Sequence, residues 1–423
     1  MRKQIAILAS CDTKFSEVKF LKDFIDNAGY QPVVIDISIG SGEIPRCDVS
    51  RDEFFNILGF TWDEVKQYSK GHLMELITSA SAIMIPKLYR EGLFHGILSL
   101  GGVQNTMVAV NGMKKLPIGI PKVIASTVAS GNRTFDSIVG TKDITVMPSI
   151  ADIAGLNCIT RNILSNAASC VIGMLDHAGT PVSKSDAIVV GTTLMGVTND
   201  GVCSAISYLQ EQGIEVVGFH STGVGGRAME ELVESRLINA VMDLTIHEIT
   251  SEYFGGGFSY GAFSRLRMLC ESGVPLLISL GGLDFVDYAI SDFPKNLDDR
   301  KYIKHNEHLA HIKITKEEAV EVAKITADRL NGSTGPVTVL IPVQGFRKDT
   351  KPGEILYDRE VDDAIIETLK NEVTSSNVKF IQVDANLNDA EFGIIAAKKM
   401  IEIIENFNGD TVSVGHNKVK GVV

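Results

Sequence analysis

The chain has 423 residues, enough for two large domains or three ordinary ones, and its 44% hydrophobic and 22% charged residues exclude disordered, collagen-like and coiled-coil proteins. Asp and Glu outnumber Lys and Arg by 52 to 40, and the net charge of −12 excludes the basic surface that binds nucleic acids or anionic membranes. Its six scattered cysteines, and the lack of an apolar run near the roughly 20 residues of a membrane span, predict a cytoplasmic protein.

The first predicted elements form a βαβ unit. Residues 5–10 are a short apolar run, as in a parallel strand that is buried on both faces. A helix with an apolar stripe follows from Ser16 and ends at Gly29, and residues 32–37 predict a second buried strand. Three more strands are predicted in this half, at 96–100, 122–126 and 145–147.

The same pattern recurs about 183 residues later in the chain. Residues 187–192 predict a strand, a helix follows that ends at Gly213, and residues 216–220 predict the next strand. The remaining predicted strands of this half are 240–244, 276–280, 337–341 and 380–383. Helical patterns between the strands indicate parallel sheets that are covered on both faces.

We therefore predict an α/β protein of two doubly wound, mostly parallel-sheet, Rossmann-like domains, and the repeated pattern suggests that one arose by duplication of the other. The first domain spans 1–180, with an insertion around 43–75 that carries Trp62, the one tryptophan. The second domain spans 181–423, after a break rich in small residues.

Ligands of open parallel sheets bind beyond the carboxyl ends of the strands, where glycines and hydroxyls surround anions. Asp36, at the end of the second strand, could hold a ribose hydroxyl or instead cap a turn. The loops could also be ordinary turns. The candidate anion-binding residues that follow the strands of the first half are Asp12, Thr13, Lys14, Gly40, Gly101, Gly102, Gln104, Asn105, Thr106, Ser130, Gly131, Asn132 and Thr141.

Two common nucleotide-binding fingerprints are missing from the sequence. A G-x-x-x-x-G-K-[ST] motif does not occur, and G-x-G-x-x-G does not follow the first strand. These absences argue against a P-loop enzyme and an ordinary NAD dehydrogenase. The letters G-x-S-x-G occur once, at Gly257-Phe258-Ser259-Tyr260-Gly261, but they do not directly follow a predicted strand, as the nucleophile elbow of hydrolases requires.

The second half offers acid, base and cationic groups at its strand ends. Glu248, Asp284 and His305 could act as acids and bases, and Arg227 could bind a carboxylate or phosphate. Each residue taken alone could equally be a cap or a surface group. The predicted catalytic set is His220, Arg227, Glu248, Asp284 and His305. No metal site is predicted, because the spacing of the histidines at 305, 308 and 311 gives only a loosely shared helix face.

Several long motifs resemble one known family. They include Cys11-Asp12-Thr13-Lys14, Gly101-Gly102 before Asn105-Thr106, residues 220–230 and Gly281-Gly282-Leu283-Asp284. The chain is similar, over nearly its whole length, to the family of the plant tomato mosaic virus resistance protein and its bacterial homologues, an uncharacterised protein family. One departure is Ala9-Ser10-Cys11, where the family usually reads Gly-Thr-Ala.

The resemblance implies an N-terminal domain that binds ATP, together with Mg²⁺, and a linked second α/β domain. It places the nucleotide loops at Asp12–Lys14, Gly101–Thr106, Ser130–Asn132 and Thr141, the positions that the strand ends also indicate.

The leading hypothesis is an ATP-binding, two-domain cytoplasmic protein with a small anionic metabolite in the interdomain cleft. One alternative is a metabolic enzyme that acts on a small carboxylated or phosphorylated metabolite with catalytic groups from the second domain. Another is a non-enzymatic interaction protein that nucleotide controls. A homodimer or higher homo-oligomer is expected because symmetric assemblies are common.

Overall fold

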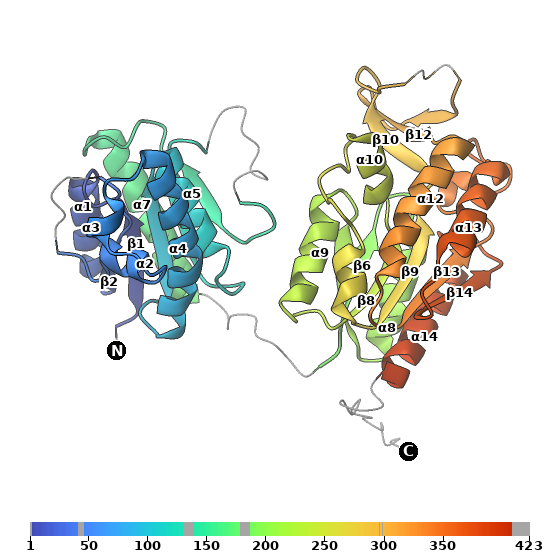
Figure 1. Cartoon of the computed structure of the whole chain (residues 1–423), viewed down its shortest axis with the longest axis horizontal. Helices are drawn as coiled ribbons and strands as arrows, with labels where there is room; N and C mark the ends of the chain where they lie inside the picture. The colour runs from blue at the N-terminus through green and yellow to red at the C-terminus, as the bar shows by residue number, and fades with distance from the viewer. Residues whose placement is uncertain are drawn as a thin grey trace. The chain divides into compact units, whose positions relative to one another are not determined.

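The computed structural model describes residues 2–40, 46–129, 139–177, 187–295, 297 and 299–407. The chain divides into two compact units, Met1–Ser183 and Lys184–Val423. Each unit contains a parallel sheet with helices on both faces (Figure 1). The predicted fold class is thereby confirmed.

The first unit is built on a five-stranded parallel sheet of order β2-β1-β3-β4-β5. This order places the topological switch point between β1 and β3, where the connections leave in opposite directions and a crevice forms. The strands are β1 (Gln4–Ala9), β2 (Gln31–Asp36), β3 (Gly96–Gly101), β4 (Lys122–Ser126) and β5 (Thr145–Pro148).

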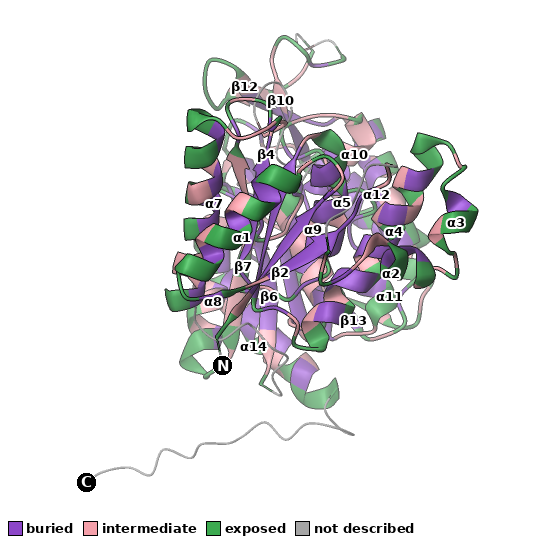
Figure 2. Cartoon of the chain, turned by 90° about the vertical axis from the view of Figure 1, so that its left-hand side faces the viewer, coloured by how far each residue is buried: buried purple, intermediate pink, exposed green. Residues whose placement is uncertain are grey.

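Alternate residues of β1 enter two separate hydrophobic layers. Ile5 and Ile7 pack with helices α1 (Phe15–Asn27) and α7 (Cys158–His177), whereas Ala6 and Leu8 pack with α4 (Lys70–Arg90) and α5 (Val103–Met113). Continuous apolar runs suit such strands because both of their faces are buried. Figure 2 shows the central strands as buried and the outward faces of the helices as exposed.

Helix α7 is the one helix of the described residues that is long and apolar enough to cross a membrane. In the structure it is a core helix instead. Leu164, Ala167 and Val171 are buried against the sheet, together with residues of α1.

The segment between β2 and β3 contains two short helices and α4. Helix α2 (Arg51–Asn56) begins at a capping box of Ser50 and Glu53, and α3 (Trp62–Val65) begins at another. The guanidinium of Arg51 lies 3.7 Å from the centre of the Trp62 ring, so the two helices are joined by a cation–π contact. This segment corresponds to the predicted insertion.

The second unit is built on a six-stranded parallel sheet of order β14-β13-β9-β8-β6-β7. Counted from its first strand, the order is that of the first unit with one more strand at the end. Its strands are β6 (Val189–Leu194), β7 (Glu215–His220), β8 (Ala240–Thr245), β9 (Leu276–Gly281), β13 (Val337–Pro342) and β14 (Val378–Val383).

Helices again cover both faces of this sheet. On one face lie α8 (Asn199–Glu211) and α14 (Ala390–Phe407). The other face carries a larger hydrophobic core, formed with α9 (Val224–Glu234), α10 (Glu248–Phe254), α11 (Arg267–Ser272), α12 (Lys316–Asn331) and α13 (Arg359–Glu372).

An antiparallel sheet that the sequence analysis did not predict interrupts the second unit between β9 and α12. It has the order β10-β12-β11, with β10 (Phe285–Ala289), β11 (Tyr302–Lys304) and β12 (Leu309–Lys313), and β10 and β12 are labelled in Figure 1. The register pairs His311 with Asp287 on one side and with Ile303 on the other. His311 and Asp287 are therefore neighbours on adjacent strands of this sheet.

Candidate functional site

A cavity of about 580 Å³ lies at the carboxyl edge of the first sheet. Asp12 and Thr13 follow β1, Gly40 follows β2, and Gln104 lies in the first turn of α5. The structure therefore brings four of the predicted nucleotide-binding residues together, at the switch point of the sheet. The cavity is also lined by Ser10, Ile39, Trp62, Lys66, Tyr68, Lys70 and Leu73.

The loops after β1 and β2 are tied together by hydrogen bonds. The N–H of Gly40 donates to Oδ2 of Asp12 at 3.1 Å, and the N–H of Asp12 donates to the hydroxyl of Ser38 at 3.0 Å. A Cβ atom at Gly40 would overlap the Asp12 carboxylate. A larger residue at this position would displace the Asp12 carboxylate and break its hydrogen bond with the N–H of Gly40.

Replacing Gly40 with alanine is expected to lower the free energy of unfolding by about 1 kcal/mol, because the added methyl group must displace the Asp12 carboxylate and break the hydrogen bond that joins the two loops. Urea unfolding followed by Trp62 fluorescence measures this loss. Gly71→Ala is the matched control, since a Cβ at Gly71 in α4 meets open space. Equal stability of the two variants would contradict the expectation.

The residues that follow β3 connect the loops at the switch point, and of these residues Gln104 lines the cavity. Asn105 is nearly buried, donates to the carbonyl of Leu100 at 2.8 Å and accepts from the hydroxyl of Ser10 at 2.5 Å. Gly101 has a φ of 143°, and the side chain of Asn105 occupies the space of its missing Cβ. Asn105 thus fastens the loops after β1 and β3 to each other.

The neighbouring residues Thr106 and Gly102 also have internal contacts. The hydroxyl of Thr106 donates to the carbonyl of Gly102 at 2.9 Å and lies 2.7 Å from the hydroxyl of Ser126. Gly102 is the N-cap of α5. The predicted role of Thr106 as a direct phosphate ligand does not match this placement, because its hydroxyl is fully buried.

Asp36 and Lys14 are held away from the cavity. Oδ1 of Asp36 accepts from the N–H groups of Cys11 and Ser38 at 3.1 and 3.0 Å, and burial raises the pKa of this carboxyl group. Asp36 is therefore a buried turn residue and is not accessible to a ribose hydroxyl. The ammonium of Lys14 donates to the carbonyl of Ile153 at 2.5 Å.

The remaining predicted nucleotide residues lie elsewhere. Thr141 is in the turn before β5 and does not line the cavity. Ser130, Gly131 and Asn132 lie outside the described residues.

The sequence analysis missed the side of the cavity that α3, α4 and the link between them supply. Trp62 and Tyr68 provide aromatic rings, and Lys66 and Lys70 provide positive charge. A lone tryptophan followed by two lysines in an inserted segment was the available signal, but it did not show that the segment folds back onto the strand ends.

A second cavity, of about 410 Å³, lies at the carboxyl edge of the sheet of the second unit. Two predicted catalytic residues, His220 and His305, line it. The sequence analysis missed Asp287, His311 and Lys348 as residues of this cavity.

Glu248 belongs to a buried ionic cluster instead of the cavity. The fully buried guanidinium of Arg265 lies 2.6 Å from Glu230, 2.7 Å from Asp243 and 3.5 Å from Glu248. Burial raises the pKa values of Glu230 and Asp243. The carboxylate of Glu248 contacts Arg265 and accepts a hydrogen bond from the hydroxyl of Ser221 at 2.6 Å. The predicted acid–base role of Glu248 is therefore not supported.

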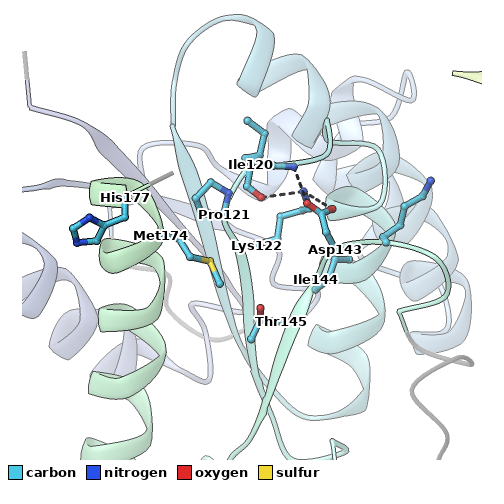
Figure 3. Close-up of a pocket in the computed structure, with 10 residues that line it drawn as sticks. Ile120, Pro121, Lys122, Asp143, Ile144, Thr145, Met174 and His177 are labelled. Carbon is cyan, nitrogen blue, oxygen red and sulfur yellow. Dashed lines mark hydrogen bonds and ion pairs between the residues drawn. The ribbon is translucent and has the colours of Figure 1, made fainter. Parts of the chain in front are cut away.

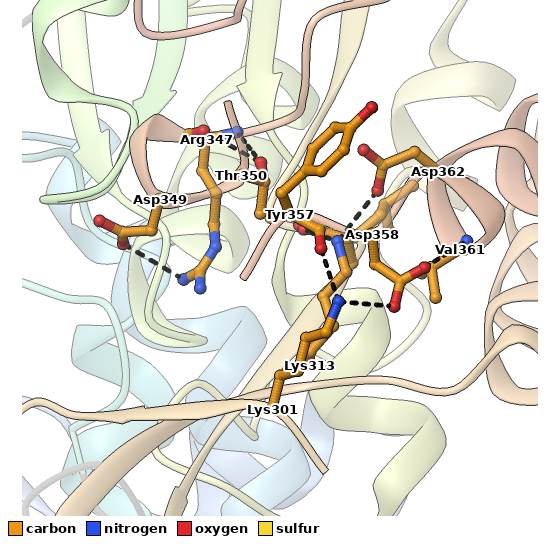
Figure 4. Close-up of polar contacts among 12 residues, drawn as sticks. Lys301, Lys313, Arg347, Asp349, Thr350, Tyr357, Asp358, Val361 and Asp362 are labelled. Atoms are coloured by element: carbon orange, nitrogen blue, oxygen red, sulfur yellow. Dashed lines mark hydrogen bonds and ion pairs between the residues drawn. The ribbon is translucent and has the colours of Figure 1, made fainter. Parts of the chain in front are cut away.

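Asp284 lies in a second buried cluster, which Figure 4 shows in part. The ammonium of Lys313 contacts Asp284 at 2.7 Å and Asp362 at 3.0 Å. Burial disfavours the charge on Asp284, but Lys313 outweighs burial and lowers its pKa, whereas burial raises the pKa of Asp362 to about 6. Asp284 is fully buried and cannot reach a substrate in this position.

Arg227 does not line the second cavity either. Its guanidinium donates to the carbonyl of Gly261 at 3.3 Å. Of the five predicted catalytic residues, the structure therefore brings only His220 and His305 to the same cavity.

A third cavity, of about 610 Å³, lies at the amino ends of β4 and β5 in the first unit (Figure 3). Its buried cation, Lys122, contacts Asp143 at 2.9 Å and donates to the carbonyls of Pro117 and Ile120 at 2.9 and 3.0 Å. All three protons of the ammonium group are thus engaged. This residue stabilises the loop before β4 and leaves no donor for a ligand.

Comparison with known proteins identifies the family. The N-terminal domain model of the uncharacterised protein family UPF0261 matches residues 3–180, and its C-terminal domain model matches residues 187–404. The chain belongs to this family. The family predicted from the motifs is thereby confirmed.

The relatives of this UPF0261 chain include bacterial and plant proteins. A UPF0261 protein of Clostridium tetani is 37% identical over 96% of this chain and 100% of its own length. The ToMV resistance protein Tm-1(GCR237) of Solanum lycopersicum is 31% identical over 95% of this chain, which spans only 56% of that relative.

One solved structure, UDP-N-acetylglucosamine 2-epimerase from Rickettsia bellii, covers 96% of this chain and is itself covered over 97% of its length. Its sequence identity is 10% and its TM-score 0.24, too low for functional comparison.

Proposed function

We propose that the first unit binds ATP, with its phosphates at the carboxyl edge of the sheet. The observation that carries the proposal is the cavity itself, in which the loops after β1 and β2 face Lys66 and Lys70. Glycine and hydroxyl groups at a switch point suit phosphate oxygens, and the lysines supply opposite charge. The aromatic rings of Trp62 and Tyr68 offer flat apolar surfaces for the base.

The donor set also fits a magnesium ion that accompanies the phosphates. Mg²⁺ in nucleotide sites is held by one or two carboxylates, by phosphate oxygens and by water. Asp12 is the carboxylate among the residues that line the cavity. In this proposal Asp12 would hold the ion, which would neutralise phosphate charge.

Binding of ATP with Mg²⁺ is expected to change the fluorescence of Trp62, the sole tryptophan of the chain, because this ring lines the cavity. A double variant, Lys66→Ala with Lys70→Ala, should bind at least ~10-fold more weakly, since two lysines that line the cavity are lost. Lys66 also pairs at 2.7 Å with Asp63, an exposed ion pair that a phosphate would replace. Calorimetry gives the dissociation constants independently of the fluorophore.

Lys87→Ala is the control, because Lys87 lies on the same helix as Lys70 and pairs at 4.0 Å with Glu91. It should bind ATP as the unaltered chain does. The proposal fails if calorimetry detects no binding of ATP, or if the double variant binds as tightly as the control. Light scattering with and without ATP tests whether nucleotide also controls self-association, as the interaction hypothesis requires.

A further inference from the structure

The cavity of the second unit is formed by segments from distant parts of the chain. Met195 and Val197 follow β6, His220 ends β7, Lys348 follows β13, and the antiparallel sheet contributes Lys304 and His311. All of these residues belong to the second unit. A ligand in this cavity therefore needs no residue of the first unit.

The contact between Arg347 and His311 fixes which nitrogen of the imidazole carries the proton. Nη1 of Arg347 lies 3.3 Å from Nδ1 of His311. A guanidinium group can only donate, so Nδ1 must accept and the proton of a neutral ring must lie on Nε2. Among the described residues no protein acceptor pairs with this Nε2–H, so it remains available to a ligand in the cavity that His311 lines.

The surroundings of His311 keep the ring neutral. Burial lowers the pKa of His311 to about 3, and the charge of Arg347 acts in the same direction. Arg347 is itself fully buried, with its guanidinium 3.9 Å from the centre of the Phe285 ring. A neutral imidazole held in one tautomer is a hydrogen-bond donor, not a base, near neutral pH.

A second buried histidine, His247, behaves in the opposite way. Its Nδ1 lies 2.8 Å from the carbonyl of Gly282, and its Nε2 lies 3.2 Å from the carboxylate of Asp287. Burial alone would lower the pKa of His247, but Asp287 outweighs it and raises the pKa. Asp287 lines the cavity, and His247 therefore compensates its negative charge.

The charges that face the cavity leave a positive surplus. Asp287 is paired with His247, and Asp349 lies 3.9 Å from Arg347. Lys304 and Lys348 also line the cavity, and within the described part of the chain neither forms an ion pair. An anionic group is the natural partner for these two exposed ammonium groups.

We propose that this cavity binds a small molecule that carries both an anionic group and a carbonyl oxygen. The anionic group lies at Lys304 and Lys348, and the carbonyl oxygen accepts a hydrogen bond from Nε2–H of His311. Apolar side chains of Met195, Val197 and Leu309 also line this cavity. They offer no hydrogen bonds, so the polar groups of the ligand bind to the two lysines and to His311.

The first test is the tautomer of His311, read by ¹⁵N NMR of the full-length, histidine-labelled protein. The expected spectrum shows a neutral ring protonated at Nε2 from pH 7.5 to pH 5, with the His311→Gln variant assigning the resonance. A ring protonated at Nδ1, or one that titrates near pH 6.5, would overturn the proposal.

The second test titrates the same sample with four probes. Pyruvate and dihydroxyacetone phosphate each carry a ketone oxygen near an anionic group. Acetate and inorganic phosphate are their respective controls, which keep the anionic group but lack the ketone. At least one carbonyl probe should shift the His311 Nε2 resonance and bind ~10-fold more tightly than its own control. The arm that binds distinguishes a carboxylate ligand from a phosphate ligand.

Variants show whether binding uses the proposed contacts. Lys348→Ala should weaken the binding probe by ~10-fold. His311→Gln, which can still donate a hydrogen bond, should bind more tightly than His311→Phe, which cannot. Lys324→Ala, on the exposed surface of α12 beside Glu321, should change nothing. Binding of neither carbonyl probe, or equal binding by all variants, would refute the proposal.

Discussion

Replacing Arg265 with methionine is expected to lower the free energy of unfolding of the second unit by about 3–5 kcal/mol. Arg265 is fully buried and is the cation that contacts the buried carboxylates of Glu230, Asp243 and Glu248. Methionine fills similar space but leaves these carboxylates without a positive charge. Urea unfolding followed by circular dichroism measures the loss.

Trp62 fluorescence serves as an internal reference in that experiment, because this residue lies in the first unit. The matched control is Arg267→Met. Arg267 and its partner Asp328 are 53% and 71% exposed, so their ion pair contributes little. A loss below about 1 kcal/mol in Arg265→Met would contradict the role given to this cluster.

Acidification from pH 6.5 to pH 4.5 is expected to remove about 2–3 kcal/mol of stability through His311 alone. The pKa of His311 is about 3 in the folded chain, against 6.5 for the unperturbed group. The unfolded chain therefore takes up the proton first, so the contribution is complete above pH 6.5 and is lost as the pH falls. Arg347, His247, His305 and Asp287 are the charged or titratable groups that act on this ring.

Asp362 acts in the opposite direction, so the measurement must isolate His311. Burial raises the pKa of Asp362 to about 6, and its contribution is complete at low pH and is lost as the pH rises from 3.8 to 6. Subtracting the pH profile of His311→Gln from that of the unaltered chain cancels this effect. Parallel profiles for the two proteins would show that His311 is not held neutral by the fold.

The parallel sheets could be predicted because short segments of the sequence determine where their strands lie. A strand buried on both faces must be a continuous apolar run, and the loops after such strands must meet at one edge. This reasoning placed Asp12, Thr13, Gly40 and Gln104 correctly beside one cavity. It also placed His220 at the edge of the second sheet, whereas His305 reaches the same cavity from the end of β11 in the antiparallel sheet.

What the sequence did not reveal depends on partners that are distant in the chain. A carboxylate at a strand end has the same sequence pattern whether it faces a ligand or a buried cation. The pattern therefore predicts catalytic roles for Glu248 and Asp284, although these residues contact Arg265 and Lys313. The antiparallel sheet escaped prediction for a related reason. Strand β12 buries His311 and Lys313, whose partners lie far away in the chain: Arg347 in the loop after β13 contacts His311, and Asp284 before β10 and Asp362 in α13 contact Lys313.

The attachment of the antiparallel sheet has a mechanical consequence. Strand β10 begins four residues after β9 ends, and β12, which carries His311, is bonded along both edges. The wall of the cavity is thus an extension of the middle of the main sheet, not a separate lid. Occupancy of the cavity should accordingly slow amide exchange with solvent deep in β9, far from any atom that the occupant touches.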